Sequence, residues 1–217
     1  MEFVALPSLT IAGIDEAGRG AVIGPLVIAG VRASENITPF LVNLGVKDSK
    51  LLTSRQRLFL YPVILRLTEA ISVKLIHPRI IDSFVLKGTK YRKLNYLEAI
   101  TMARIISDLG PKRAYVDAAD SNAERFAQQV QGALPIQIDI ISMHGADRVI
   151  PVVSAASIIA KVIRDTAIEG LHQRYGEFGS GYPSDSRTVA LVRRLAAKRS
   201  RTNIVRRSWK TWRRCLE

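Results

Sequence analysis

Two kinds of apolar stretch alternate along this 217-residue chain. Short runs that contain β-branched residues predict strands over residues 10–15, 26–31, 71–76, 114–117 and 136–141. Longer stretches with apolar residues every three or four positions predict helices over residues 54–70, 94–109, 121–130, 151–175 and 186–198. Strands that alternate with helices are typical of an α/β domain. No internal repeat and no linker rich in Gly, Ser or Pro divides the chain.

The helix predicted over residues 151–175 is the most regular one, and Pro151 suits its first turn. Four polar side chains at spacings of three, four and four residues form one stripe on this otherwise apolar helix: Ser154, Ser157, Lys161 and Asp165. Such a stripe is usually the solvent-exposed face of a helix. The wall of a groove is the alternative, and the pattern leaves both interpretations open.

Positive charge is concentrated near the C-terminus. The chain has 32 basic and 19 acidic residues, a net charge of +13, and residues 187–217 alone hold 11 basic residues and one acidic residue. A cationic segment on a nearly neutral body predicts an anionic partner, because neutralised phosphates release condensed counterions. Nucleic acid is the favoured partner; an acidic membrane surface and a segment that only aids solubility are the alternatives.

The last part of this segment, residues 206–214, interleaves Trp209 and Trp212 with five basic side chains. Aromatic rings among cations suit base stacking and phosphate contact. Two tryptophans three residues apart also suit the packing of a terminal turn onto the body of the protein. The sequence does not decide between the two.

Several other classes of protein are excluded. The single Cys215 rules out a disulfide framework and a zinc site built on several thiolates. No apolar run approaches the roughly 20 residues that span a bilayer, and no basic stretch precedes the first apolar residues as in a signal peptide. The three histidines are scattered, and neither a Gly-x-Ser-x-Gly nor a Walker A sequence occurs. We therefore expect a cytoplasmic protein with no membrane partner.

Two adjacent carboxylates, Asp15 and Glu16, follow the apolar strand residues 11–14, and the turn Gly18-Arg19-Gly20 comes next. Strand ends beside glycine-rich turns are where α/β sheets place their sites. Adjacent carboxylates repel each other unless one is protonated or a cation lies between them, and a hard divalent ion suits oxygen ligands. A plain turn is the alternative, since Asp and Gly are common turn residues.

Two further carboxylates occupy comparable positions. Asp117 ends a predicted strand, and Asp147 lies just before the helix that starts at Pro151. A strand-end pair and single carboxylates from two other elements are able to hold two divalent ions. Two ions about 4 Å apart activate a water and stabilise the leaving oxygen of a phosphodiester.

Three other acidic residues have simpler expected roles. We expect Asp120 to cap the helix that opens at Ser121 and Asp139 to face solvent. Asp165 is expected to pair with Lys161 across one helical turn. These three are therefore not assigned to the site.

The sequence resembles type 2 ribonuclease H (ribonuclease HII) in blocks that follow the family's order. These blocks are Ile14–Gly20 with Gly24-Pro25 behind it, Lys47–Lys50, Tyr115–Asp117, His144–Asp147, Pro151–Lys161 and Gly179–Asp185. They extend over residues 10–212, nearly the whole chain. The form of the 144–165 block is similar to archaeal members.

The resemblance implies a ribonuclease H fold, which is a mixed β-sheet flanked by helices with additional C-terminal helices. It implies a catalytic domain over residues 1–185 and a basic helical segment over residues 186–217 packed on the same groove. The implied reaction is hydrolysis of the RNA strand of RNA–DNA hybrids, and cleavage 5′ of single ribonucleotides in duplex DNA, leaving 3′-hydroxyl and 5′-phosphate ends. The implied cofactor is Mg²⁺ or Mn²⁺, two ions per site. The implied role is removal of misincorporated ribonucleotides and primers by a monomer.

The resemblance also implies a role for particular residues. The metal-binding catalytic carboxylates would be Asp15, Glu16, Asp117 and Asp147. The turn formed by Gly18, Arg19 and Gly20 would bring its backbone to the ribose 2′-hydroxyl, which distinguishes RNA from DNA. Tyr182 would pack on the deoxyribose that follows the ribonucleotide. Three side chains would bind phosphates together with groove-facing arginines: Lys47, Ser49 and Lys161.

The sequence departs from the family pattern at some positions. Gly145 stands where we expect a lysine, which removes a positive charge beside the site, and Ala118 and Ala119 replace a more polar pair. The C-terminal residues lack a Gln-x-x-aliphatic-x-x-aromatic-aromatic motif, so they give no signal for a sliding clamp. Two alternative functions remain: a non-catalytic basic protein that binds nucleic acid, and a nuclease of related fold that acts on branched DNA.

Overall fold

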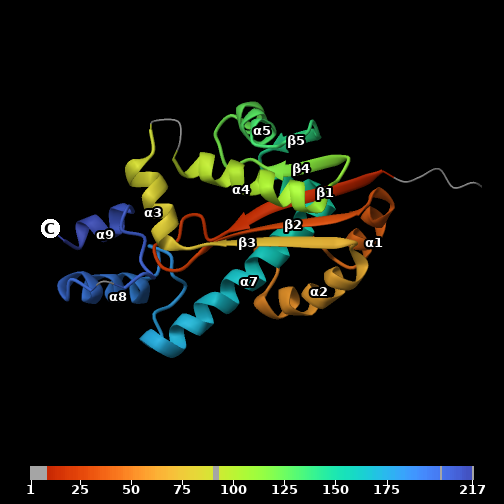
Figure 1. Cartoon of the computed structure of the whole chain (residues 1–217). Coiled ribbons are helices and arrows are strands. Elements are labelled where there is room, and N and C mark those ends of the chain that lie inside the picture. The colour runs from red at the N-terminus through yellow and green to blue at the C-terminus, as the bar shows by residue number, and fades with distance from the viewer. Residues whose placement is uncertain (1–8, 90–92, 201, 217) are drawn as a thin grey trace, which may run out of the picture.

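The computed structural model describes residues 9–89, 93–200 and 202–216. A five-stranded mixed sheet in the order β3-β2-β1-β4-β5 lies between two layers of helices (Figure 1). The strands are β1 (Thr10–Ala17), β2 (Leu26–Ser34), β3 (Ala70–Ile76), β4 (Arg113–Asp117) and β5 (Asp139–Met143). β1, β2 and β3 pair antiparallel, whereas β1, β4 and β5 pair parallel. The predicted α/β fold with a mixed sheet flanked by helices is confirmed.

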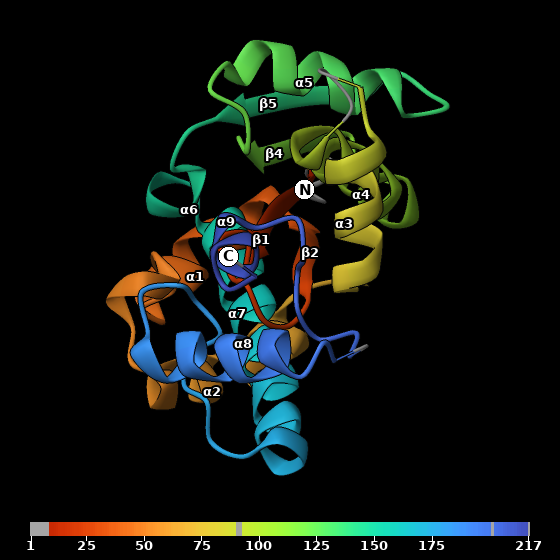
Figure 2. The ribbon, with the colours of Figure 1, turned by 90° about the vertical axis from the view of Figure 1, so that its left-hand side faces the viewer.

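Helices cover both faces of the sheet. One face carries α1 (Thr38–Asn43), α2 (Ser54–Leu67) and α7 (Pro151–Tyr175), and the other carries α3 (Pro78–Lys87), α4 (Leu94–Leu109) and α5 (Ala123–Gly132). α6 (Ala146–Val149) leads into α7, and two short 3-10 turns are η1 (Glu35–Ile37) and η2 (Ser49–Leu51). α8 (Ser186–Ala197) and α9 (Lys210–Arg214) lie at one end of the sheet (Figure 2). No helix within the described residues is long and apolar enough to cross a membrane.

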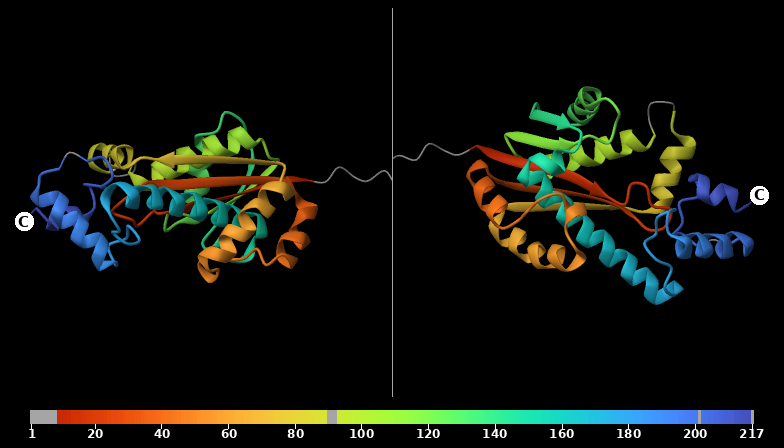
Figure 3. Two further views of the ribbon diagram at one scale, coloured as in Figure 1. Left: turned by 90° about the horizontal axis from the view of Figure 1, so that it is seen from below. Right: turned by 180° about the vertical axis from the view of Figure 1, so that it is seen from behind.

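Alternate residues of β1 face the two helical layers. Ile11 and Ala17 belong to a buried cluster with α7, whereas Ala12 belongs to a second cluster with α4. Because successive side chains of a strand point to opposite faces, Asp15 points to the α7 side and Glu16 to the α4 side. The two views of Figure 3 show α7 lying across its face of the sheet.

Helix α7 comes very close to β1 at Gly13. A Cβ atom at Gly13 would lie 2.3 Å from the backbone carbonyl carbon of Val152, so a side chain would push the helix off the sheet. The helix begins at Pro151, as predicted. Ser154 and Ser157 are both buried. The polar stripe of this helix is therefore not a solvent-exposed face over these positions.

The C-terminal helices build a third buried cluster with the loop that follows β1. Val192 of α8 and Trp212 of α9 pack with Val22 and Ile23. Trp212 is only 6% exposed, so it packs the terminal turn onto the body, which was one of its two predicted roles.

Some elements depart from the hydrophobic pattern. β5 begins at Asp139, three residues later than predicted, because the Gln131 side chain bonds to the backbone of Ile136 and Ile138 in place of a neighbouring strand. Ile136 is 62% exposed, so this apolar residue, which seemed to be part of an alternating strand pattern, does not contribute to the core. Helices α1 and α3 have no counterpart in the predicted pattern.

Candidate active site

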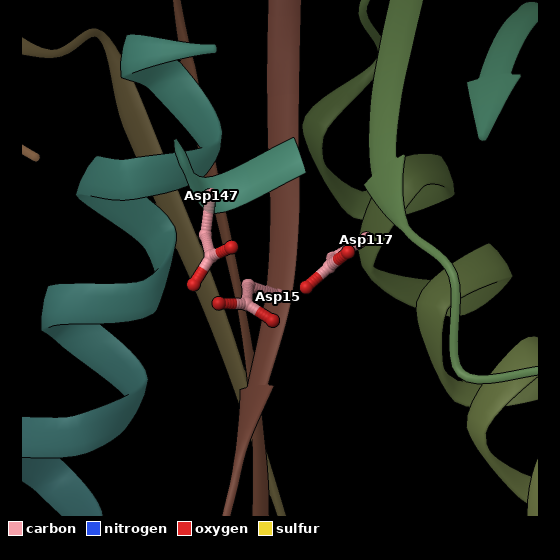
Figure 4. A group of neighbouring side chains, drawn as sticks. All are labelled: Asp15, Asp117 and Asp147. Atoms are coloured by element: carbon pink, nitrogen blue, oxygen red, sulfur yellow. The ribbon is translucent and has the colours of Figure 1, made fainter. Parts of the chain in front are cut away.

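Three aspartates from three elements point toward one another at one edge of the sheet (Figure 4). Asp15 lies in β1, Asp117 is the last residue of β4, and Asp147 lies in α6. Each offers a carboxylate oxygen, and these oxygens all lie within 4.8 Å of one another. Since β1 and β4 are adjacent and parallel, their carboxyl ends meet at the same edge of the sheet. The close approach of α7 at Gly13 brings the neighbouring α6 to that edge as well.

A pocket of about 240 Å³ is lined by Asp15, Asp117 and the fourth predicted carboxylate, Glu16. Asp147 is buried and is not part of this lining. The sequence placed Asp15 at the last position of the predicted strand and Glu16 just after it, but β1 continues through Ala17, which pairs with Val27. Both carboxylates therefore lie inside the strand, because β2 extends the ladder beyond the apolar residues. The strand's alternation separates the two side chains, and Glu16 lies toward Glu98 of α4.

Among the described residues, Asp15, Glu16 and Asp117 form no ion pair, whereas Asp147 pairs with Lys50. Burial raises the pKa of Asp15 well above its usual range, and the charges of Glu16 and Asp117 raise it further. Burial, together with Glu98 and Asp117, raises the pKa of Glu16 to about 8. Within the described part of the chain, Glu16 Oε2 and Asp147 Oδ1 are buried without a hydrogen-bond partner. A divalent cation would satisfy these oxygens and favour the ionised carboxylates, so the residues fit a metal site.

Backbone and hydroxyl groups hold two of the aspartates in place. The backbone N–H groups of Gly145 and Ala146 donate to Asp117 Oδ1 over 2.7 and 3.2 Å. These bonds oppose the rise in the pKa of Asp117 that burial causes. Ser154 Oγ donates to the backbone carbonyl of Asp147 over 2.6 Å. Gly145 has a φ of +67°, a conformation that favours glycine, which gives a physical reason for the absence of a lysine there.

Cationic and hydroxyl side chains line the pocket beside the carboxylates. Lys50 Nζ lies 3.2 Å from Asp147 Oδ2, and although burial opposes it, this contact raises the pKa of Lys50. The hydroxyls of Ser49 and Ser157 bond to each other over 2.9 Å. Lys161 lies on the same wall of the pocket. Of the predicted phosphate-binding residues, Ser49 and Lys161 are therefore in the pocket.

Lys47 is exposed and does not line this pocket, so its predicted phosphate contact stays a prediction. Lys50, three residues later in the same sequence block, lies in the pocket instead and was not among the predicted site residues. Lys161 also pairs with Asp165 over 2.7 Å, as predicted. The sequence pattern alone gave no signal for choosing between the two lysines of the 47–50 block.

A turn over residues 18–20 forms another side of the pocket. Gly18 has a φ of +86°, and a Cβ there would lie 2.8 Å from the Pro25 carbonyl oxygen, so glycine is required for the backbone. A Cβ at the exposed Gly20 would lie 4.0 Å from the ring of Tyr182. A side chain at Gly20 would therefore fill the space between the turn and that ring.

The Arg19 side chain anchors this turn to α4. Its Nε donates to both carboxylate oxygens of Glu98, over 2.9 and 3.1 Å, and its Nη2 donates to Asn95 Oδ1 and to the Ala119 carbonyl. Glu98 is fully buried, and burial raises its pKa to about 7 against the opposing charge of Arg19. The guanidinium thus fixes the position of the turn.

A buried arginine lies behind Tyr182. Arg164 of α7 is 2% exposed, and its guanidinium carbon lies 4.6 Å from the centre of the Tyr182 ring. Its Nη2 donates to the Ser180 carbonyl over 2.5 Å. The same side chain would meet a Cβ on Gly18 at 3.3 Å, so Arg164 connects the Tyr182 loop to the turn.

Two other acidic residues lie outside the cluster. Asp139 has a half-exposed side chain, as predicted. Asp120 does not cap α5; Asn122 does, because its side chain accepts from the backbone of Arg125. Asp120 accepts from the Asn122 N–H, one residue before α5, and from the Asn95 side chain, so it belongs to the network that holds Arg19.

The sequence patterns missed two buried charges beside the pocket, Glu98 and Arg164, although each had a signal. Glu98 falls four residues after Leu94 on the apolar face of a predicted helix, and a carboxylate on such a face requires a buried partner. Arg164 falls three residues after Lys161, on the polar stripe of α7.

Comparisons with known proteins agree on one family. Residues 12–212 match the family model described as Ribonuclease HII. Ribonuclease HII of Caldivirga maquilingensis is 46% identical over 205 residues, which cover 94% of this chain and 93% of that protein. The crystal structure of ribonuclease H2 from Pyrococcus horikoshii OT3 has a TM-score of 0.86 at 42% identity, over 95% of this chain and 97% of that chain. A chain in the PCNA:RNase HII complex from Archaeoglobus fulgidus has a TM-score of 0.84 at 38% identity, again over 95% and 97%.

Proposed function

The chain belongs to the ribonuclease HII family, and from that premise we propose that it cuts duplex DNA 5′ of single embedded ribonucleotides and cuts the RNA strand of long RNA–DNA hybrids. Membership makes it a ribonuclease H endonuclease, a metal-dependent hydrolase of phosphodiester bonds. One observation carries the finer proposal: Asp15, Asp117 and Asp147 converge beside the turn at residues 18–20. The aspartates suit phosphodiester hydrolysis, and the turn, with its exposed Gly20, suits recognition of a 2′-oxygen.

The four carboxylates would hold the cofactor, for which we propose two Mg²⁺ or Mn²⁺ ions: Asp15, Glu16, Asp117 and Asp147. Such ions supply activation of a water molecule and stabilisation of the leaving oxygen, which leaves 3′-hydroxyl and 5′-phosphate ends. The protein keeps its ligands in place beforehand, through the backbone of Gly145 for Asp117 and through Ser154 for Asp147.

Cationic residues around the carboxylates would hold the substrate phosphates. Lys50 and Lys161 line the pocket, so both would place positive charge next to the scissile phosphate. Lys47 lies outside the pocket and would contact a phosphate further along the strand. Exposed arginines of residues 186–217 would add contacts to the duplex on the same groove, beside the catalytic domain of residues 1–185. Such contacts provide affinity without sequence preference.

Recognition of the ribonucleotide would come from the two sides of the pocket that face each other. The backbone of Gly18, Arg19 and Gly20 would approach the ribose 2′-hydroxyl, the group that DNA lacks. Tyr182 would pack on the deoxyribose that follows, with its ring supported from behind by Arg164. A substrate with one ribonucleotide between deoxyribonucleotides would then satisfy both sides. The corresponding role is removal of misincorporated ribonucleotides and primers by a monomeric enzyme.

Cleavage of an end-labelled DNA duplex with one ribonucleotide tests the proposal. We expect a single cut 5′ of the ribonucleotide with Mg²⁺ or Mn²⁺, no cut with EDTA, and no cut in an all-DNA duplex of the same sequence. The 5′ product should be extended by a DNA polymerase, because its end is a 3′-hydroxyl.

Each control separates an alternative function. Cleavage of branched all-DNA substrates without any ribonucleotide requirement would contradict the proposal and favour a branched-DNA nuclease. Cutting confined to long hybrids would keep the nuclease and contradict the role of Tyr182. Salt-dependent binding without metal-dependent turnover would favour a non-catalytic nucleic-acid-binding protein.

A further inference from the structure

The loop after β1 is bound to the C-terminal segment through one buried arginine. Arg206 is fully buried, and its Nη1 donates to the Arg19 carbonyl over 2.8 Å. Its Nε and Nη2 both donate to the Gly24 carbonyl, over 3.2 and 3.1 Å. One planar guanidinium thus spans the loop from Arg19 to Gly24, a geometry that the single ammonium of a lysine does not reproduce.

Backbone pairing holds the same loop from the same side. The Arg206 N–H donates to the Val22 carbonyl over 2.9 Å, and the Gly24 N–H donates to the Ile204 carbonyl over 2.9 Å. Val22 also donates to the Gly181 carbonyl, which lies next to Tyr182. The pocket turn, the Tyr182 loop and the C-terminal segment are therefore one connected unit.

Arg206 has no ion-pair partner among residues 9–89, 93–200 and 202–216, and carbonyl oxygens accept its hydrogen bonds. Its guanidinium carbon lies 5.0 Å from the ring centre of Trp209. Burial, and then the nearby charge of Arg164, lowers the pKa of Arg206 to about 10, so it stays protonated at neutral pH. A full positive charge therefore acts on the Arg19 carbonyl in a dry environment, where charge-assisted hydrogen bonds are strong.

The Arg19 carbonyl and the Gly20 N–H belong to the same peptide group. A cation bound at the oxygen withdraws electrons from that group and makes its N–H a stronger donor, as in any chain of hydrogen bonds. Gly20 is exposed beside the ring of Tyr182. Its N–H finds no acceptor within the part of the chain that the structure describes, so this donor is available to a ligand.

We propose that Arg206 is a positioning residue for ribonucleotide recognition: it fixes and polarises the Arg19–Gly20 peptide so that the Gly20 N–H donates to the ribose 2′-oxygen. This inference rests on the proposed function and deepens it. It gives the C-terminal segment a role in specificity as well as in affinity. It also separates Arg206 from Arg207, whose exposed side chain bonds to the Ser200 carbonyl and touches neither end of the loop.

The preference in binding for a one-ribonucleotide duplex over an all-DNA duplex tests this role without cleavage. Asp117→Asn serves as an inactive background in which the dissociation constant is measured for a one-ribonucleotide duplex and for the matched all-DNA duplex, with Mn²⁺ present. Arg206→Gln and Arg206→Lys are added to this background, and Arg207→Gln is the matched control. Arg206→Lys keeps the charge and the bulk, so it provides a folded protein if the glutamine variant loses its cooperative melting transition.

The expected result is a loss of discrimination and not of binding. The ratio of the two dissociation constants should fall about tenfold or more in Arg206→Gln and Arg206→Lys, which corresponds to about 1.4 kcal/mol. In the Arg206 variants, affinity for the all-DNA duplex should stay within about twofold. Arg207→Gln should keep the discrimination of the background, because a phosphate contact that it loses weakens the binding of both duplexes alike. In otherwise wild-type enzyme, Arg206→Lys should lower kcat/KM for the one-ribonucleotide duplex by a similar factor.

Two results would overturn the role of Arg206. One is unchanged discrimination in a folded Arg206 variant, and the other is an equal loss of affinity for both duplexes, which indicates a merely structural part. If the wild-type chain itself neither cuts nor prefers the ribonucleotide duplex, the proposed function fails and takes this inference with it. If the wild-type chain cuts and only the Arg206 variants behave unexpectedly, the proposed function stands.

Discussion

The carboxylate cluster and the turn that face the pocket differ in how many of their polar groups already have partners within the protein. In the carboxylate cluster (Asp15, Glu16, Asp117 and Asp147), two buried oxygens, Glu16 Oε2 and Asp147 Oδ1, have no hydrogen-bond partner among the described residues. Burial also raises the pKa of Asp15, Glu16 and Asp117. In the recognition turn (residues 18–24), the Arg19 and Gly24 carbonyls accept from Arg206, and Arg19 itself is bonded to Glu98. The cluster therefore needs a ligand to balance its charge, whereas the turn is already assembled.

This difference agrees with the task proposed for each half of the pocket. A carboxylate site for divalent ions must favour a cation over protons and hydrogen-bond donors, so excess negative charge is useful there. A site that detects one hydroxyl group must present its donors in a fixed geometry before the substrate arrives, because ordering them on binding would cost affinity. The buried arginines Arg164 and Arg206 provide that rigidity on the recognition side.

We expect the largest effect from a substitution in the carboxylate cluster. Asp117→Asn removes a charged ligand but keeps an oxygen that is able to accept from Gly145. Cleavage of the one-ribonucleotide duplex should fall by at least about 10³-fold, while hybrid binding stays within about tenfold, because the phosphate contacts remain. Gel assays of cleavage and binding, with circular dichroism to confirm the fold, provide the measurement. Full retention of activity would contradict the site.

The next largest effect is expected from a substitution on the recognition side of the pocket. Arg164→Met removes the cation behind the Tyr182 ring and the bond to the Ser180 carbonyl. A displaced ring should lower kcat for the one-ribonucleotide duplex by about 10- to 100-fold, since small displacements from a productive geometry are costly. Activity on long hybrids should fall much less. Arg174→Met, on an exposed position of the same helix, is the control and should match the wild type; an equal loss on both substrates would argue against the role of Arg164.

A third experiment sharpens the comparison through stability. The pKa of Glu16 is raised to about 8 in the folded protein, from an ordinary value near 4.5. The folded state therefore binds the proton more tightly, so without metal ions the free energy of unfolding should fall as pH rises from about 4.5 to 8, by up to about 1.4 kcal/mol per unit of pKa difference.

Urea denaturation in EDTA at pH 5 and pH 8 measures this loss. Glu16→Gln cannot ionise and should show a flatter pH dependence than the wild type. Added Mn²⁺ should restore stability to the wild type at pH 8, because an ion that binds only the folded state stabilises it. Identical pH profiles for the two proteins would show that Glu16 is not held in an unfavourable environment.

The smallest effect concerns the two lysines of one sequence block. Lys47 is exposed and outside the pocket, whereas Lys50 lies 3.2 Å from Asp147. Lys47→Ala should raise KM by about two- to threefold and reduce the salt dependence of binding slightly, as expected for one phosphate contact. Lys50→Ala should also lower kcat. Initial rates at two salt concentrations distinguish them, and a larger kcat effect at Lys47 would reverse the assignment.

Periodicity predicted the long internal elements well and the edges poorly. α4 and α7 have the predicted bounds because each repeats its apolar positions over several turns and has a clear signal at one end, Gly110-Pro111 after α4 and Pro151 for α7. β5 lies at the edge of the sheet, where Gln131 supplies hydrogen bonds that a neighbouring strand would otherwise make. Hydrophobic periodicity does not show which backbone groups a polar side chain such as Gln131 bonds to, even when they lie only five and seven residues away.

The sequence by itself determined the chemical inventory: four carboxylates, a glycine turn, a long helix with a polar stripe and a basic C-terminal segment. Only the tertiary structure decided how these parts are used. β1 continues past its apolar residues and directs Asp15 and Glu16 to opposite faces, because strand pairing sets its length. Arg206 is buried beneath a turn 187 residues away, because burial of a charge depends on which carbonyl groups the fold brings to it. The sequence specifies the type of each residue, whereas the groups that bond to a buried charge come from distant parts of the chain and are known only from the fold.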